Sequence, residues 1–231
     1  MTTLSIIRAA LLASLCLVLT GCLLARQSAP TVVLAPEVTV VPAAEWPVVG
    51  WSLLVDRPRA DAMSDSARVL IRPAPAQLQV YKGAAWLEPV PDLLQSILLR
   101  AFEDSGRITA VSRVGNARSR FRLYTEIRRF EAVASDGGRL TVQLEIHAKL
   151  ILTRDASVLS AVNFNAQARS ADNQLPALTR AFEQALQELT NAVVGWTLQQ
   201  GEQAEAGLQP AGLYRDSVAP KGAPTMRPIG V

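Results

Sequence analysis

The chain has 231 residues, 49% of them hydrophobic, which suits a single domain of ordinary size with appendages. Its 23 Lys and Arg residues against 20 Asp and Glu residues give a net charge of +3. The basic residues are scattered along the sequence, which argues against a nucleic-acid-binding protein and against a polybasic membrane-binding segment.

The first 21 residues have the pattern of a signal peptide. Arg8 supplies a positive charge, and residues 9–19 form an uninterrupted run of apolar and small side chains that is too short to span a bilayer comfortably. Residues 19–22 are Leu-Thr-Gly-Cys and match a bacterial lipobox, in which small residues precede the cysteine that receives the lipid. We therefore expect cleavage after residue 21 and lipid attachment at Cys22. The alternative is an ordinary signal peptide with a chance cysteine.

The cysteine content agrees with a lipoprotein. The sequence has two cysteines, and Cys16 lies in the segment that would be removed. With Cys22 acylated, the mature protein would have no free thiol and no internal disulfide. Leu23 follows the cysteine where an Asp would retain an enteric lipoprotein in the inner membrane. We expect a lipid-anchored protein at the periplasmic face of the cell envelope, with the outer membrane favoured.

Three parts are predicted for the mature chain. Residues 22–50 form a lipidated tether, because prolines at regular intervals oppose helix and sheet and favour extended chain; they are Pro30, Pro36, Pro42 and Pro47. The 28 residues after the cysteine could reach about 90 Å. Residues 51–200 form the folded domain. Residues 201–231, with five Gly and four Pro, form a disordered tail.

Three strands and a helix open the predicted domain. The strands are expected over residues 51–56, 68–73 and 77–82. Apolar residues at helical spacing then predict a helix over residues 92–104, with Asp92 as its N-cap and Gly106 as its stop.

Four further strands and a final helix follow. The strands are expected over residues 107–113, 120–130, 139–152 and 157–168. Residues 139–152 alternate apolar and polar side chains, which predicts one buried and one solvated face. Residues 136–138, Asp-Gly-Gly, predict a hairpin, and the last helix covers residues 175–199. The predicted fold class is α+β: a single antiparallel-rich β-sheet with two helices packed on one face.

The segment between the third strand and the first helix carries Tyr81, Lys82 and Trp86. A structural interpretation is that Tyr81 and Trp86 cover the end of the sheet beneath the helix. A functional interpretation is that all three residues form a docking surface for a partner protein. Aromatic residues are favoured at the centres of interfaces, and binding residues gather in loops beside rigid elements. The two interpretations are compatible.

Catalytic chemistry has little support in the sequence. His147 is the single histidine, and it lies on the polar face of a predicted strand between Glu145 and Lys149, which is typical of a surface residue. The mature chain would have no cysteine nucleophile, and no phosphate, zinc or calcium motif is present. We therefore expect a non-enzymatic protein without a cofactor or a metal site.

The region from residue 68 to residue 106 closely resembles the signature region of the ABC-type transport auxiliary lipoprotein family. The resemblance rests on the order of Pro-x-Pro at 73–75, Tyr-Lys-Gly at 81–83, Trp86 and Pro-Asp-Leu-Leu at 91–94. It continues more loosely through residues 139–152 and the final helix. Ala85 stands where family members often have a basic residue before the tryptophan.

The resemblance implies a function that the residue pattern alone does not show. Lipoproteins of this family act with an ABC transporter and with an MCE-domain (mammalian cell entry) protein that moves lipids across the envelope. It implies a membrane-anchored periplasmic accessory protein. Assembly into a homo-oligomer is compatible with this role. Two other classes stay open: a binding or assembly module of another envelope machine, and, less favoured, a small hydrolase with an unusual site.

Overall fold

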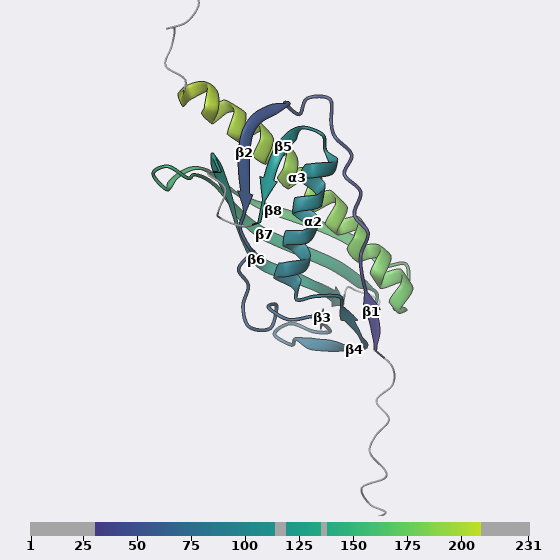
Figure 1. Cartoon of the computed structure of the whole chain (residues 1–231). Helices are drawn as coiled ribbons and strands as arrows, with labels where there is room; N and C mark the ends of the chain where they lie inside the picture. The colour runs from purple at the N-terminus through teal and green to yellow at the C-terminus, as the bar shows by residue number, and fades with distance from the viewer. Residues whose placement is uncertain (1–30, 114–118, 135–137, 209–231) are drawn as a thin grey trace, which may run out of the picture.

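The computed structural model describes residues 31–113, 119–134 and 138–208, which form one domain (Figure 1). The predicted signal peptide, Cys22, the first part of the predicted tether and residues 209–231 lie outside the described residues, as do residues 136 and 137 of the predicted hairpin. The helices and strands, in chain order, are β1 (Val32–Leu34), β2 (Val49–Val55), β3 (Arg68–Arg72), β4 (Gln79–Trp86), α2 (Val90–Asp104), β5 (Ile108–Ser112), β6 (Phe121–Ala134), β7 (Leu140–Leu152), β8 (Ser157–Arg169) and α3 (Leu175–Leu208).

Three long antiparallel strands make the largest part of the sheet. β6 pairs with β7 over its whole length, and β7 pairs with β8. The alternation predicted for residues 139–152 is confirmed, because β7 buries every second side chain from Val142 to Leu152. The polar residues of β7 lie on the opposite, half-buried face.

The prediction of an antiparallel-rich sheet is wrong for the rest of the structure. The second edge of β6 is shared by two short strands that both run parallel to it: β2 beside residues 121–123 and β3 beside residues 132–133. β5 is parallel to β2, β4 is antiparallel to β3, and β1 is parallel to β4. Parallel neighbours need a crossover connection, and the parallel strands β2 and β5 are joined by the segment that contains β3, β4 and α2. The eight-stranded sheet is therefore mixed.

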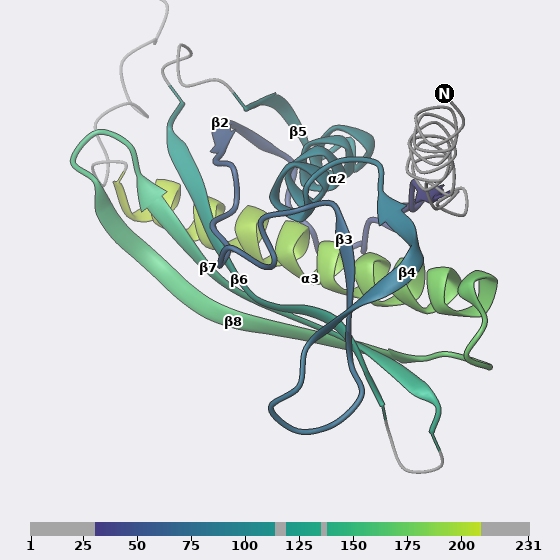
Figure 2. The same ribbon diagram turned by 90° about the horizontal axis from the view of Figure 1, so that it is seen from below.

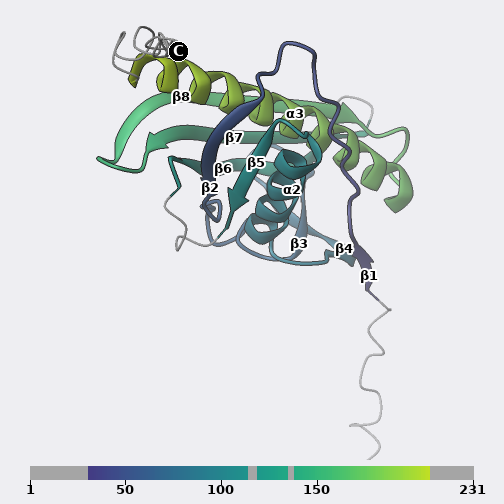
Figure 3. The same cartoon turned by 45° about the horizontal axis from the view of Figure 1, so that its top comes forward.

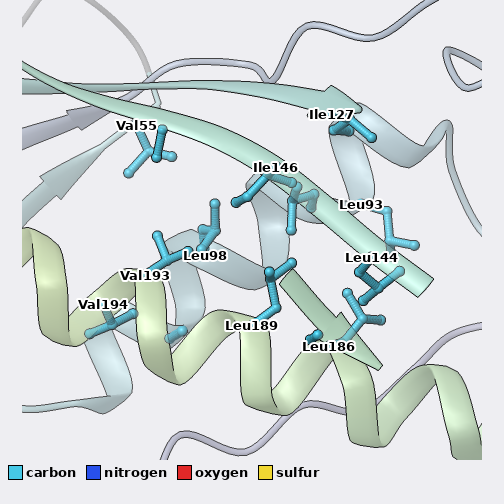
Figure 4. Close-up of a cluster of buried hydrophobic side chains, with 14 of the residues drawn as sticks. Val55, Leu93, Leu98, Ile127, Leu144, Ile146, Leu186, Leu189, Val193 and Val194 are labelled. Atoms are coloured by element: carbon cyan, nitrogen blue, oxygen red, sulfur yellow. The ribbon is translucent and has the colours of Figure 1, made fainter. Parts of the chain in front are cut away.

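The prediction that both helices pack on one face of the sheet is wrong. The sheet curls around them, so that α3 packs against β7 and β8 while α2 packs against β2, β5 and α3 (Figures 1 and 2). Curvature of this kind follows from the right-handed twist of long strands. The apolar stripes of both helices then meet inside the curled sheet, where Leu98 of α2 and Val193 of α3 are fully buried (Figure 4).

The tether prediction does not describe residues 31–50. β1 pairs with residues 84–86 of β4, and the chain then runs along α2 and α3 to β2 (Figures 1 and 3). The Val41 amide donates a hydrogen bond to Oδ1 of Asn191 on α3 at 3.2 Å. Trp46 is buried, and its ring lies directly on Gly195 of α3. The prolines break regular structure only at their own positions, so short extended segments between them can still pair and pack.

The last helix extends past its predicted end at residue 199 and occupies the start of the predicted tail, as far as Leu208. Gly201, the first residue of the predicted tail, is buried inside the helix against the ring of Trp51. Beyond it, Glu202 accepts a hydrogen bond from Nε1 of Trp51 at 3.3 Å, and Glu205 accepts one from Arg120 at 2.7 Å. These contacts hold the final turns of α3 against the domain.

We predict that Gly195→Ala destabilises the protein. An ideal Cβ at this position would lie 2.5 Å from Nε1 of Trp46, so the indole must leave its site or the helix must shift. Overpacking of this kind costs about 1–3 kcal/mol of the free energy of unfolding, measurable by urea denaturation. Gly207→Ala is the matched control, because it lies in the same helix with nothing within 4 Å of an added Cβ. Equal stability of the two variants would contradict the proposed Trp46 contact.

Candidate functional site

The Tyr-Lys-Gly motif forms a wide bulge in β4. Leu70 of β3 pairs with Val80 and Arg68 pairs with Ala85, so two steps along β3 correspond to five steps along β4. Gly83 lies within the extra residues with a φ of 78°, a conformation that side chains rarely adopt. After the bulge, β4 pairs with β3 again, and the Trp86 side chain is directed into the core. Bulges commonly change the direction of side chains beside functional sites.

Trp86 belongs to the core. It is 2% exposed, and its ring contacts Phe182 and Phe130 edge-on at centroid distances of 4.9 and 5.6 Å. Its Nε1 atom has no hydrogen-bond partner among the described residues. The burial contradicts a place for Trp86 on an exposed docking surface and supports the structural interpretation for this residue.

The other two residues of the predicted docking surface differ from Trp86. Tyr81 is half-buried and packs against the edge of the core, whereas Lys82 is exposed. The structure therefore does not bring the three side chains together on one surface. A docking contact through Lys82, with the outer part of Tyr81, stays a prediction.

A groove lies beside α2, bounded on its other side by the chain that follows β1. Its volume is about 220 Å³. Apolar and charged side chains line it together; among them are Pro36, Val38, Leu87, Ile97, Glu37, Glu88 and Arg100. A mixture of apolar and charged side chains is common at protein-contact sites. Sequence reasoning missed the groove because one wall comes from residues assigned to the tether.

Leu87 is the most exposed large apolar side chain of this groove, with 64% of its surface accessible. It directly follows the core residue Trp86, so the strand that buries the tryptophan also positions the leucine at the groove. The Leu87 amide donates a hydrogen bond to the Leu34 carbonyl at 2.9 Å, which ties this point of the chain to β1. The position of Leu87 is therefore set by backbone contacts as well as by the core.

An ion-pair cluster fixes the start of α2. Arg57 donates two hydrogen bonds to Asp92, at 2.7 and 2.9 Å, and two to Asp65, at 2.7 and 3.2 Å. The guanidinium lowers the pKa of both carboxyl groups below the usual range. Asp92 is not the N-cap predicted from the sequence, because the helix starts two residues earlier with Pro89 as its cap. Its carboxylate instead joins the helix to the loop between β2 and β3.

The single histidine of the sequence lies on the outer face of the long strands. His147 is half-buried there, and its Nδ1 atom lies 2.6 Å from Oδ1 of Asn163 on β8, which is an ordinary surface contact. Within residues 31–113, 119–134 and 138–208, no three His, Cys, Asp or Glu side chains gather in a way that could hold a metal ion. Over the same ranges, neither helix has the length and apolar character needed to cross a bilayer.

The sequence profile of the ABC-type transport auxiliary lipoprotein component matches residues 33–194. The chain belongs to this family. The match starts at β1, which agrees with the packing of residues 31–50 on the domain, and it includes the groove beside α2.

Solved structures support the family and the fold. The crystal structure of a Xanthomonas campestris protein assigned to the family DUF330 is 40% identical to the chain, with a TM-score of 0.74, and the similarity covers 76% of this chain and 99% of that one. A second crystal structure, of an uncharacterised protein, shares the fold at 11% identity with a TM-score of 0.53, covering 68% of this chain and 97% of that one. A search of curated proteins found no match.

We predict that Asp92→Asn lowers stability at neutral pH by about 0.5–1 kcal/mol, the range for a partly exposed ion pair, since 35% of the Asp92 side chain is accessible. The folded-state pKa of Asp92 is lowered, so the unfolded state takes up protons first. The difference between the wild type and the variant should be present above a pH of about 4 and be lost as the pH falls through the folded-state pKa.

The measurement is urea denaturation at several pH values. Asp104→Asn is the matched control, because this exposed carboxylate at the other end of α2 makes no ion pair with a described residue. A stability difference for Asp92→Asn that does not change with pH would show that the ion pair is not its cause.

Proposed function

We propose that the chain is the membrane-anchored, non-enzymatic accessory component of an MCE-type ABC system that moves lipids across the Gram-negative envelope. Membership of the ABC-type transport auxiliary lipoprotein family supports the transport role. The MCE partner and the lipid cargo come from the resemblance of the signature region to lipoproteins of such systems. The mixed groove beside α2 is the observation that favours a protein-contact role for the domain.

The anchor in this proposal is the acylated Cys22, at the periplasmic face of the envelope and with the outer membrane favoured. The lipobox at residues 19–22 supports it. Several acyl chains hold a protein on a membrane far more durably than one chain does, at about 0.8 kcal/mol for each buried methylene group.

We expect Cys22→Ser to leave an uncleaved precursor that takes up no labelled fatty acid. The measurement is metabolic labelling with a fatty acid, followed by the mass of the purified chain. Cys16→Ser is the matched control and should be processed and labelled like the wild type, because Cys16 lies in the segment that is removed. Labelling of the Cys22→Ser protein would refute the anchor.

The groove beside α2 is the proposed contact with the partner protein. Leu87 and Ile97 offer apolar surface, and the charged residues of the lining are Glu37, Glu88 and Arg100. Because two of these three charges are negative, the groove suits a partner segment with an apolar side chain and a basic neighbour. Because both walls of the groove lie within the matched family range, the contact would be a property of the folded domain rather than of the flanking segments.

We predict that Leu87→Glu weakens capture of the native transporter partner about tenfold, because a charge would have to be buried at the contact. The partner complex is solubilised in detergent and captured on the full-length lipoprotein. Leu87 is exposed, so the melting temperature should change by no more than about 2 °C. Val48→Glu is the matched control, because Val48 is 71% exposed and does not line the groove.

Two outcomes would contradict the groove as the contact. One is normal capture by a folded Leu87→Glu protein. The other is an equal loss of capture in Leu87→Glu and Val48→Glu, which would show a non-specific effect of the added charge.

The predicted docking contact at Tyr81 and Lys82 is tested by the same capture in detergent. Lys82→Glu should weaken capture without changing the melting temperature if this lysine contacts the protein partner, because its side chain is exposed.

Gene neighbours that encode an ATPase, a permease and an MCE protein would separate lipid transport from the alternative of another envelope machine.

A further inference from the structure

The packing of residues 31–50 shortens the link between the domain and its anchor. β1 begins at Val32, so residues 23–30 are the whole connection between the lipidated cysteine and the start of the described domain. Eight residues span at most about 30 Å even when fully extended. The domain must therefore stay close to the membrane, with the start of β1 as its nearest fixed point.

Exposed apolar side chains gather at that end of the domain. Figure 1 shows β1 beside β4 at this end of the domain. Val32 and Val33 of β1 are 50% and 57% exposed, and Leu78, directly before β4, and Val80 of β4 are 36% and 39% exposed. We call these four residues the β1–β4 patch. Clustered apolar exposure of this kind marks a contact surface, whereas isolated exposed residues need no explanation.

The charged residues of the strands that carry the patch are all basic. The segments that form β1, β3 and β4 contain no Asp or Glu and three basic residues. Arg72 is paired with Glu131 inside the sheet at 2.8 Å, whereas Lys82 and Arg68 have exposed side chains. Arg68 pairs with Ala85, and Ala85 pairs with Val33, so an exposed basic residue and an exposed apolar residue lie in one row across the three strands.

We propose that the β1–β4 patch rests on the lipid leaflet that holds the acyl chains of Cys22. The apolar side chains lie at the boundary between head groups and acyl chains, and Lys82 and Arg68 contact lipid phosphates. Long basic side chains keep their charge in the polar layer while their methylene groups lie on apolar surface. A single lipid anchor leaves a tethered domain free to rotate, and a second contact fixes its orientation.

This inference rests on the proposed lipid anchor and adds a role for the surface around it. With the patch on the membrane, the groove extends from the end of β4, near the membrane, along α2 and away from it (Figure 1). The C-terminal end of α3 lies at the end of the domain away from β1 and β4 (Figure 1). Lys82 then serves the lipid surface rather than the protein partner, which separates this inference from the docking prediction for the same residue.

The test uses the acylated full-length protein in vesicles of phosphatidylethanolamine and phosphatidylglycerol. With Cys22 acylated and Cys16 removed, a single introduced cysteine is the only thiol available for an environment-sensitive fluorophore. The probe sites are Val33→Cys and Val80→Cys. The matched controls are Val48→Cys and Val158→Cys, which are 71% and 54% exposed and lie outside the patch.

We expect blue-shifted emission at the two patch sites, and quenching by spin-labelled lipids that is about twofold or more stronger than at the control sites. Adding Lys82→Glu and Arg68→Glu should remove that difference in vesicles and leave partner capture in detergent unchanged. Equal quenching at all four sites would overturn the inference, as would a mature protein that carries no acyl chain.

Two results separate this inference from the proposed function. Loss of partner capture in detergent by Lys82→Glu would assign this surface to a protein and overturn the lipid contact. Failure of the native transporter to bind at all, with strong quenching at the patch sites, would refute the proposed function and leave the lipid contact standing.

Discussion

The contact between Trp46 and Gly195 determines how the first part of the domain is arranged. A large indole ring can lie on α3 only where the helix has no side chain, and Gly195 provides that place. The same solution recurs two turns later, where Gly201 accommodates Trp51. These contacts hold β2 and the segment before it against the helix. They thereby support one wall of the groove and leave a short connection to the predicted anchor at Cys22.

A second constraint acts on the signature motif. Trp86 must reach Phe130 and Phe182 inside the curled sheet, while the chain before it remains paired with β3. The bulge around Gly83 makes both arrangements possible. The tryptophan of the family motif therefore has a structural role in the core. Its exposed neighbours Lys82 and Leu87 are placed by that core and remain available for contacts with a membrane or a protein.

Much of the fold could be predicted from the sequence, because side-chain periodicity reports the burial of each element. The alternation of residues 139–152 and the stripe of residues 92–104 gave the right element types. Periodicity does not report which strand lies alongside, so the parallel pairing of β2 and β3 with β6 was not predictable. β1 has three residues between two prolines, too few to show a pattern. One wall of the groove is formed by residues 35–38, which follow β1, so the groove was missed. The burial of Trp86 was one of two interpretations that the sequence left open.

The most direct test of the account is photocrosslinking in living cells from a benzoylphenylalanine placed at position 97 in the groove. Ile97 is half-buried on α2 and faces the groove, so a probe there should be next to a bound partner. The account predicts an adduct with the MCE-domain protein of the transport system from position 97 and none from position 158 on β8. Adducts from position 158 alone, or an adduct from position 97 with a protein of another envelope machine, would contradict it.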